Sequence, residues 1–206
     1  MQHIFRLVRQ SAIIEAIPQK GSLIPLMSLL HAILGILNLT EASGYDLKTQ
    51  MFDRTVAHFW QADQAQIYRT LEKLSEQGWV ESRLEIQTER PNRKVYRITE
   101  AGRAELRRWL SEPQALPIHR EPFLIQLFFG AILPNQTLIA LAKHQLKLHE
   151  QKLAEFEQIP LPTLDTQPDR PHTLMRLTLD LGIASERLYI DWLKQVIATL
   201  ENLPEP

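Results

Sequence analysis

The stretch from residue 64 to residue 110 predicts a helix, a β-hairpin and a second helix in direct succession, and this order restricts the possible folds more than any other feature. In its first part, Ile67, Leu71 and Leu74 recur at helical spacing and form one apolar stripe on an otherwise polar segment. Gly78 follows at a position where a residue with positive φ commonly ends a helix. The sequence therefore predicts an amphipathic helix that ends just before Gly78.

Two short runs with period-2 alternation, 79–85 and 94–98, come next and are joined by a polar turn that includes residues 90–93. These runs predict a β-hairpin with a basic tip. Thr99 is a favourable N-cap for a helix that reaches residue 110, with an acidic residue in its first turn and arginines near its end. Helix, hairpin and helix in this order form the second half of a winged helix-turn-helix. The sequence thus predicts a mostly α-helical fold with a small β-hairpin wing, and DNA binding.

The segment before this stretch supplies the remaining helices of such a domain. Residues 26–39 are strongly apolar, and because the run is too short to span a bilayer it predicts a buried helix. A turn over 40–44 follows. Ser43 is a favourable N-cap for the next helix, and Asp63 is one for the helix that begins at residue 64. The side chains expected to face inward from the second helix are Leu47, Met51 and either Tyr45 or Phe52.

The candidate DNA contacts are amide, aromatic and basic side chains at the start of the predicted recognition helix and at the hairpin tip. The major groove admits an α-helix, and amide and guanidinium groups make paired hydrogen bonds to base edges there. Tyrosine and lysine reach phosphates, and basic residues gathered between 90 and 108 suit phosphate neutralisation. The alternative is an ordinary solvated charged surface. The candidates are Gln64, Gln66, Tyr68, Arg69 and Lys73 on the helix, and Arg90, Asn92, Arg93 and Lys94 on the wing.

The net charge changes sign between the two parts of the chain. Residues 1–111 carry 15 basic and 12 acidic side chains, a net charge of +3, whereas residues 112–206 carry 8 basic and 12 acidic ones, a net charge of −4. This asymmetry is typical of a DNA-binding part joined to a part that does not touch DNA. The expected organisation is an N-terminal arm over 1–25, a winged helix-turn-helix domain over 26–111, a linker over 112–121, and a C-terminal α-helical dimerisation domain over 122–206.

The C-terminal part predicts two long helices, over 134–158 and 172–202. In the second, isoleucines recur every seven residues, which resembles a coiled-coil seam. Two interpretations stay open: contact between two copies of the chain, or packing within one subunit. A homodimer also suits the expected task, because a two-fold dimer reads two half-sites about one helical turn apart. The residues assigned to dimerisation are Leu179, Ile183, Ile190, Leu193, Ile197 and Leu200.

Other classes of function find little support in the sequence. The chain has no cysteine, which excludes disulfides, thiolate metal sites and cysteine nucleophiles and suits a reducing cytosol. No apolar run approaches the roughly 20 residues of a membrane span. His144 and His149 are not at the i, i+4 spacing of a helical metal pair, and no Gly-rich phosphate loop or nucleophile elbow is present. We expect a cytoplasmic protein without membrane contact, metal or cofactor that is not an enzyme.

Residues 29–110 resemble the PadR family of bacterial transcriptional regulators. Two departures from the family pattern are Ala65, where glycine is frequent, and Arg69, where proline is common; the arginine adds a candidate DNA contact. The matching pieces are HAILGIL (31–37), SGYDL (43–47), FW (59–60), QIYRTLEKL (66–74), EQGWVE (76–81), RKVYRITEAG (93–102) and LRRWL (106–110).

The resemblance implies a homodimeric winged-helix repressor that binds an inverted repeat in double-stranded DNA near its target promoter. Some members of the family release DNA when a small aromatic or lipophilic effector binds. Trp60, Trp79, Trp109 and Trp192 are candidates for lining such a pocket, and the alternative, which we favour for each of them, is that they fill the core or the dimer interface. A second class of function stays open: a dimeric protein-interaction or ligand-sensing module with weak DNA affinity. Glutamates near the proposed DNA face favour it.

Overall fold

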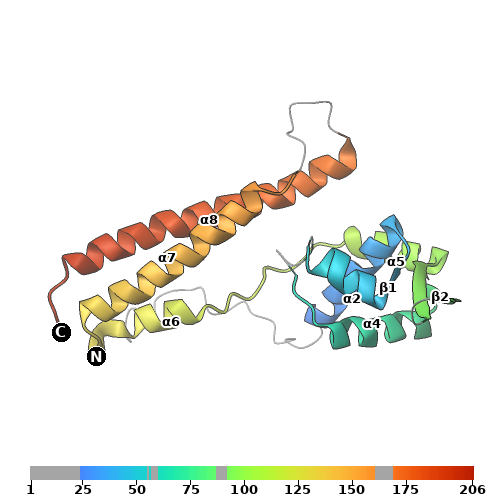
Figure 1. The fold of residues 1–206 in the computed structure, drawn as a ribbon, viewed down its shortest axis with the longest axis horizontal. Helices are drawn as coiled ribbons and strands as arrows, with labels where there is room; N and C mark the ends of the chain where they lie inside the picture. Colours follow the sequence, from blue (N-terminus) through green and yellow to red (C-terminus); the bar gives the residue numbers. More distant parts are fainter. Residues whose placement is uncertain (1–23, 55, 57–59, 87–91, 161–168) are drawn as a thin grey trace. The chain divides into compact units, whose positions relative to one another are not determined.

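The computed structural model describes residues 24–54, 56, 60–86, 92–160 and 169–206. The chain divides into two compact units, Met1–Ala115 and Leu116–Pro206 (Figure 1). The division falls within residues 112–121, the predicted linker, while nearly all of the predicted N-terminal arm lies outside the described residues. Within the described ranges, no helix is both long enough and apolar enough to cross a membrane.

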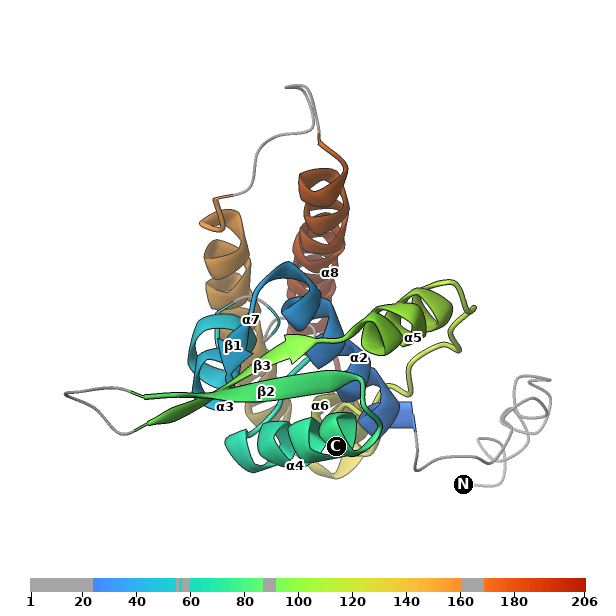
Figure 2. The same ribbon diagram turned by 90° about the vertical axis from the view of Figure 1, so that its right-hand side faces the viewer.

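The first unit is a small helical domain with one antiparallel sheet, and the predicted fold class is confirmed. Its core is formed by α2, η1 and α4 together with the sheet and α5, and the side chains with almost no exposed surface include Ile33, Leu34, Phe52, Ile67 and Leu71. Figure 2 shows β2 and β3 reaching beyond the helices of this unit as a wing. The elements are α2 (Ile24–Leu39), β1 (Ala42–Ser43), α3 (Gly44–Asp46), η1 (Leu47–Phe52), α4 (Gln64–Glu76), β2 (Val80–Glu85), β3 (Arg93–Ile98) and α5 (Glu100–Leu110).

The sheet has three strands in the order β1-β3-β2, one more than the predicted hairpin. Ser43 of β1 lies opposite Val95 of β3, and Glu85 of β2 lies opposite Arg93. The sequence predicted a turn at β1, because two residues are too few to show the alternation that reveals a strand. This short strand ties the segment before α3 to the wing.

The helix predicted after Ser43 winds in two ways. The α-helical turn α3 passes into a π-helical turn, η1, in which the Asp53 amide donates to the Lys48 carbonyl five residues earlier at 2.9 Å. Wider winding places residues five apart on one face. Leu47 and Phe52 are therefore the buried pair, and Tyr45 is 60% exposed, so the choice between Tyr45 and Phe52 is settled in favour of Phe52.

The second unit consists of α6 (Pro122–Phe128), η3 (Gly130–Ile132), α7 (Asn135–Glu157) and α8 (Arg170–Glu201). The two long helices run side by side, as Figure 1 shows, and pack through three apolar clusters. Of the six residues assigned to dimerisation, five are buried and Ile197 is partly buried. All except Ile190 belong to the clusters that join α8 to α6 or α7 in the same chain. These side chains thus take part in packing within one subunit, and their contribution to a dimer stays a prediction.

Candidate nucleic-acid interface

Helix α4 begins with the cap predicted from the sequence. The Asp63 carboxylate accepts a hydrogen bond from the Gln66 amide at 2.7 Å, and the Asp63 amide donates to the Gln66 side-chain oxygen at 3.0 Å. This reciprocal capping box fixes the start of the helix. It also occupies the carbonyl oxygen of Gln66, which a paired contact to adenine needs. Gln64, also exposed, makes no hydrogen bond through its side chain within the described part of the chain.

The rest of α4 has one buried and one exposed side. Ile67, Thr70, Leu71 and Leu74 are buried, so Arg69 projects from the opposite side. Tyr68 and Lys73 are also exposed, and all five candidates on this helix therefore reach the surface. Among the described residues, no carboxylate lies within ion-pair distance of Arg69 or Lys73. Their positive charges are available to an anionic partner, although Glu72 and Glu76 share the exposed side.

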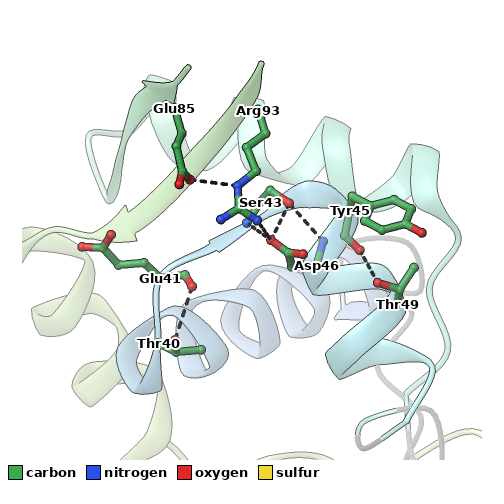
Figure 3. Close-up of polar contacts among 8 residues, drawn as sticks. All are labelled: Thr40, Glu41, Ser43, Tyr45, Asp46, Thr49, Glu85 and Arg93. Atoms are coloured by element: carbon green, nitrogen blue, oxygen red, sulfur yellow. Dashed lines mark hydrogen bonds and ion pairs between the residues drawn. The ribbon is translucent and has the colours of Figure 1, made fainter. Parts of the chain in front are cut away.

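Where the pairing of β2 with β3 ends, opposite Glu85, Arg93 is held by two carboxylates (Figure 3). Its Nε donates to Glu85 Oε2 at 2.8 Å and its Nη1 to Asp46 Oδ2 at 3.3 Å. The same Asp46 oxygen accepts the Ser43 amide at 3.1 Å and the Ser43 hydroxyl at 2.7 Å, as part of the capping box of α3. The Glu85 carboxylate raises the pKa of Arg93 further above its already high value. Arg93 thus joins the wing to the start of α3.

The other arginines of the hairpin and of α5 that the structure describes are paired as well. Arg97 Nε lies 2.7 Å from Glu81, Arg83 pairs with Glu41, and Arg107 Nη2 lies 3.0 Å from Glu100. Counting charges between residues 90 and 108 overestimated the positive potential of this region, because several of the neutralising acids lie outside that interval, in α3 and β2. Sequence proximity could not reveal those partners.

The remaining wing candidates differ in their surroundings. Lys94 is exposed, and its ammonium lies 5.2 Å from the centre of the Tyr96 ring. Asn92 is exposed just before β3. Arg90 lies outside the described residues. Lys94 is the described wing cation for which no carboxylate partner is found within the described ranges.

A buried network beneath this surface joins α2 to α5. The His31 Nε2 lies 2.9 Å from Glu105 Oε1, and the imidazole stacks on the Trp109 ring with centroids 4.5 Å apart. Arg108 binds both oxygens of Glu105: its Nη2 donates to Oε1 at 2.6 Å and its Nε donates to Oε2 at 2.7 Å. Hydrogen bonds from Arg108, and then from His31, lower the pKa of Glu105 to about 2 despite its burial. Trp109 therefore packs on a buried partner, and Trp60 and Trp79 pack on the core.

The second unit contains a polar cluster that sequence reasoning missed. The Tyr189 hydroxyl donates to Glu121 Oε2 at 2.5 Å, and the Tyr189 ring stacks on His149 with centroids 4.5 Å apart. His149 Nδ1 in turn lies 2.5 Å from Glu186. Trp192 contacts the edges of both Tyr189 and Phe123. The residues come from α6, α7 and α8, so only the folded unit brings them together.

Comparison with known proteins identifies this arrangement. Residues 33–108 match the transcriptional regulator PadR-like family, and residues 119–201 match the family described as virulence activator alpha C-term. The negative transcriptional regulator PadR of Bacillus subtilis is 32% identical over 180 residues, which cover 84% of this chain and 97% of that protein.

Solved structures agree over the same length. Bacillus subtilis PadR in complex with operator DNA superposes with a TM-score of 0.73 at 32% identity, covering 84% of this chain and 99% of that one. Its complex with p-coumaric acid gives a TM-score of 0.69 at 31% identity over 84% and 98% of the two chains. The Vibrio cholerae virulence activator AphA gives 0.69 at 29% identity over 85% and 99%. The chain therefore belongs to the PadR-like family of transcriptional regulators.

Proposed function

We propose that this regulator is a homodimeric repressor that inserts α4 into the major groove of an operator in double-stranded DNA. The observation that carries the proposal is the exposed side of α4, where Arg69 and Lys73 have no acidic partner among the described residues. The Bacillus subtilis PadR complex with operator DNA supports the mode of binding, and the description of that relative as a negative regulator supports repression. Such a protein acts beside the chromosome in the cytoplasm and catalyses no reaction.

Each candidate on α4 has a role that follows from its position. Arg69 projects opposite the buried stripe and reaches base edges, where a guanidinium makes paired hydrogen bonds to guanine. Lys73, one turn further on, and the Tyr68 hydroxyl bind phosphates and fix the register. Gln64 supplies an amide at the helix start, and Gln66 acts chiefly as a cap.

The dimer contact is assigned to a different face of α8 from the one predicted. Leu174, Leu177, Leu181 and Leu188 are 51–70% exposed and recur at helical spacing on the side opposite the buried seam. A row of exposed leucines on a helix is typical of an interface. We assign this row to contact with a second copy; Ile197 lies on the opposite side, among the side chains that pack on the clusters within the subunit.

An aromatic acid is the effector class that the relatives favour, because Bacillus subtilis PadR was crystallised with p-coumaric acid. A small aromatic acid is accordingly proposed to release this regulator from its operator. The alternative function, an interaction or sensing module with weak DNA affinity, is favoured by the acid-paired arginines of the wing.

Fluorescence anisotropy with the DNA upstream of the chain's own gene, against random DNA and across a salt series, tests the proposal. We expect a preference for the upstream DNA that falls steeply with salt, and loss of that preference in Arg69→Ala. A genome-wide selection of bound fragments covers a distant operator. Equal, weak binding to every fragment would overturn the repressor and favour the interaction module.

Light scattering on Leu181→Glu/Leu188→Glu tests the dimer. We expect the mass of one chain for this variant and of two chains for the unaltered protein. Leu39→Glu is the matched control, since Leu39 is 69% exposed but lies in the first unit. An unchanged mass for the double variant would remove the assignment of this face.

A further inference from the structure

The register of β2 and β3 divides the wing into two faces. Residues directly opposite each other in an antiparallel pair point to the same side of the sheet. The pairs Val80–Ile98 and Leu84–Lys94 therefore lie on one face of the hairpin. One end of this face belongs to the core, because Val80 and Ile98 are buried. We name it the core-side face; its members are Val80, Ser82, Leu84, Lys94, Tyr96 and Ile98. The outer face carries Glu81, Arg83, Glu85, Arg93, Val95 and Arg97.

The arginines of the outer face are all engaged in ion pairs. Its three arginines are paired with Glu41, Glu81, Glu85 and Asp46. These four carboxylates outnumber the arginines, so a phosphate approaching this face would meet net negative charge and would have to displace existing ion pairs. The outer face is poorly suited to a polyanion.

The core-side face differs in charge and in polarity. None of its six members is acidic, and its cation is Lys94. Where this face extends past the core, Leu84 is 65% exposed. Alternation places Ile86 on the same side, and Ile86 is 79% exposed. Exposed aliphatic side chains beside a cation suit the groove of a duplex, where apolar residues pack on sugars and base steps while cations neutralise phosphates.

We propose that the wing presents its core-side face to DNA, with Lys94 on a phosphate and with Leu84 and Ile86 packed against deoxyribose. Arg93, a predicted DNA contact, is instead a positioning residue that holds β3 to β2 through Glu85 and to the start of α3 through Asp46. This inference rests on the proposed DNA-binding function, and it assigns two contacts, Leu84 and Ile86, that sequence reasoning did not consider.

Salt-dependent anisotropy with the tightest fragment from the genome-wide selection tests the proposal on the full-length chain. Leu84→Ser/Ile86→Ser is expected to weaken DNA binding roughly tenfold, because a small aliphatic contact area is lost. Its salt slope stays unchanged, because an apolar contact releases no counterions. Lys94→Ala is expected to reduce the slope by about one unit per protomer. Leu39→Ser is the matched control for an exposed leucine outside the wing.

A charge-balanced variant tests Arg93. Arg93→Ala/Glu85→Ala removes one charge of each sign, and if Arg93 only positions the wing, the salt slope stays at the value of the unaltered chain even where affinity falls. Arg97→Ala/Glu81→Ala is the matched pair on the same face.

The outcomes separate the two proposals. Full affinity in Leu84→Ser/Ile86→Ser, or a reduced slope in the Arg93 and Glu85 pair, would overturn the assignment of the face while leaving DNA binding in place. A changed mass of Leu84→Ser/Ile86→Ser with full affinity would assign the aliphatic pair to contact between copies and would also overturn it. Failure of the unaltered chain to prefer any fragment would overturn the repressor itself.

Discussion

The Tyr68 ring of α4 lies directly against the backbone of Gly44, so closely that a Cβ at residue 44 would lie 2.6 Å from Tyr68 Cε1. Gly44→Ala is therefore expected to push the ring outward and to cost about 1–2 kcal/mol of unfolding free energy. Chemical denaturation of a double-mutant cycle checks the cause. In a Tyr68→Ala background, where the clash is absent, Gly44→Ala should cost almost nothing. An equal cost in both backgrounds would show that Gly44 matters for another reason.

Gly102, in the first turn of α5, is constrained by backbone instead of by a side chain. A Cβ there would lie 2.1 Å from the Trp79 carbonyl oxygen, which itself accepts the Thr99 amide at 3.0 Å and cannot easily move. We expect Gly102→Ala to destabilise the first unit by about 1–3 kcal/mol. Gly35, inside α2, has nothing within 4 Å of such a Cβ. Gly35→Ala should stabilise by about 0.5–1 kcal/mol, and thermal unfolding of the two variants measures the contrast.

The elements that the sequence predicted well are those with strong local signals. Asp63 and Thr99 cap α4 and α5 as expected, and Gly78 adopts the expected positive φ of 68°. A side chain that reaches back to a neighbouring amide is a local event, and its pattern is written in adjacent residues. The two-residue strand β1 and the π-helical turn η1 leave no such pattern, because their geometry depends on packing against β3 and the core.

Charge partners were the least predictable part of the site. The acids that pair with Arg83 and Arg93 come from as far as 42 and 47 residues away, so no window along the chain links them. The seam of α8 shows the same limitation: isoleucines recurring every seven residues reveal an apolar face, but not whether α7 or a second copy covers it. Tertiary neighbours decide both questions.

Acid should weaken the junction between α2 and α5. Glu105, only 11% exposed, has its pKa lowered to about 2 by the Arg108 and His31 hydrogen bonds. A carboxyl with a depressed folded-state pKa stabilises the fold above its unfolded value, near 4, and this contribution disappears as the pH falls toward 2. Because Arg108 is half exposed, solvent screening limits the contribution to about 2 kcal/mol.

Glu105→Gln makes this dependence measurable. Its unfolding free energy in urea should lie below that of the unaltered chain at pH 7, and the two should converge as the pH drops from about 4 to 2. Glu100→Gln is the control, because Glu100 is 79% exposed on the same helix. A difference between Glu105→Gln and the unaltered chain that stays constant down to pH 2 would contradict the assignment of the low pKa to Glu105.

Alkali should act on the second unit through Tyr189. Its hydrogen bond to Glu121, together with burial and the nearby charges of Glu121 and Glu186, raises the pKa of the phenol to about 12. The neutral phenol therefore stabilises the start of α6 fully below pH 10, the ordinary value for tyrosine, and this contribution is lost as the pH rises toward 12. Absorbance at 295 nm should show the Tyr189 phenol ionising in a late step near pH 12. Tyr189→Phe should remove that late step and lower stability at pH 8 by about 1–2 kcal/mol, since Glu121 loses its donor. Tyr45→Phe, at a residue 60% exposed, is the control and should leave the late step in place. If Tyr189→Phe instead left the late step in place, the phenol held against Glu121 would not be the group with the raised pKa.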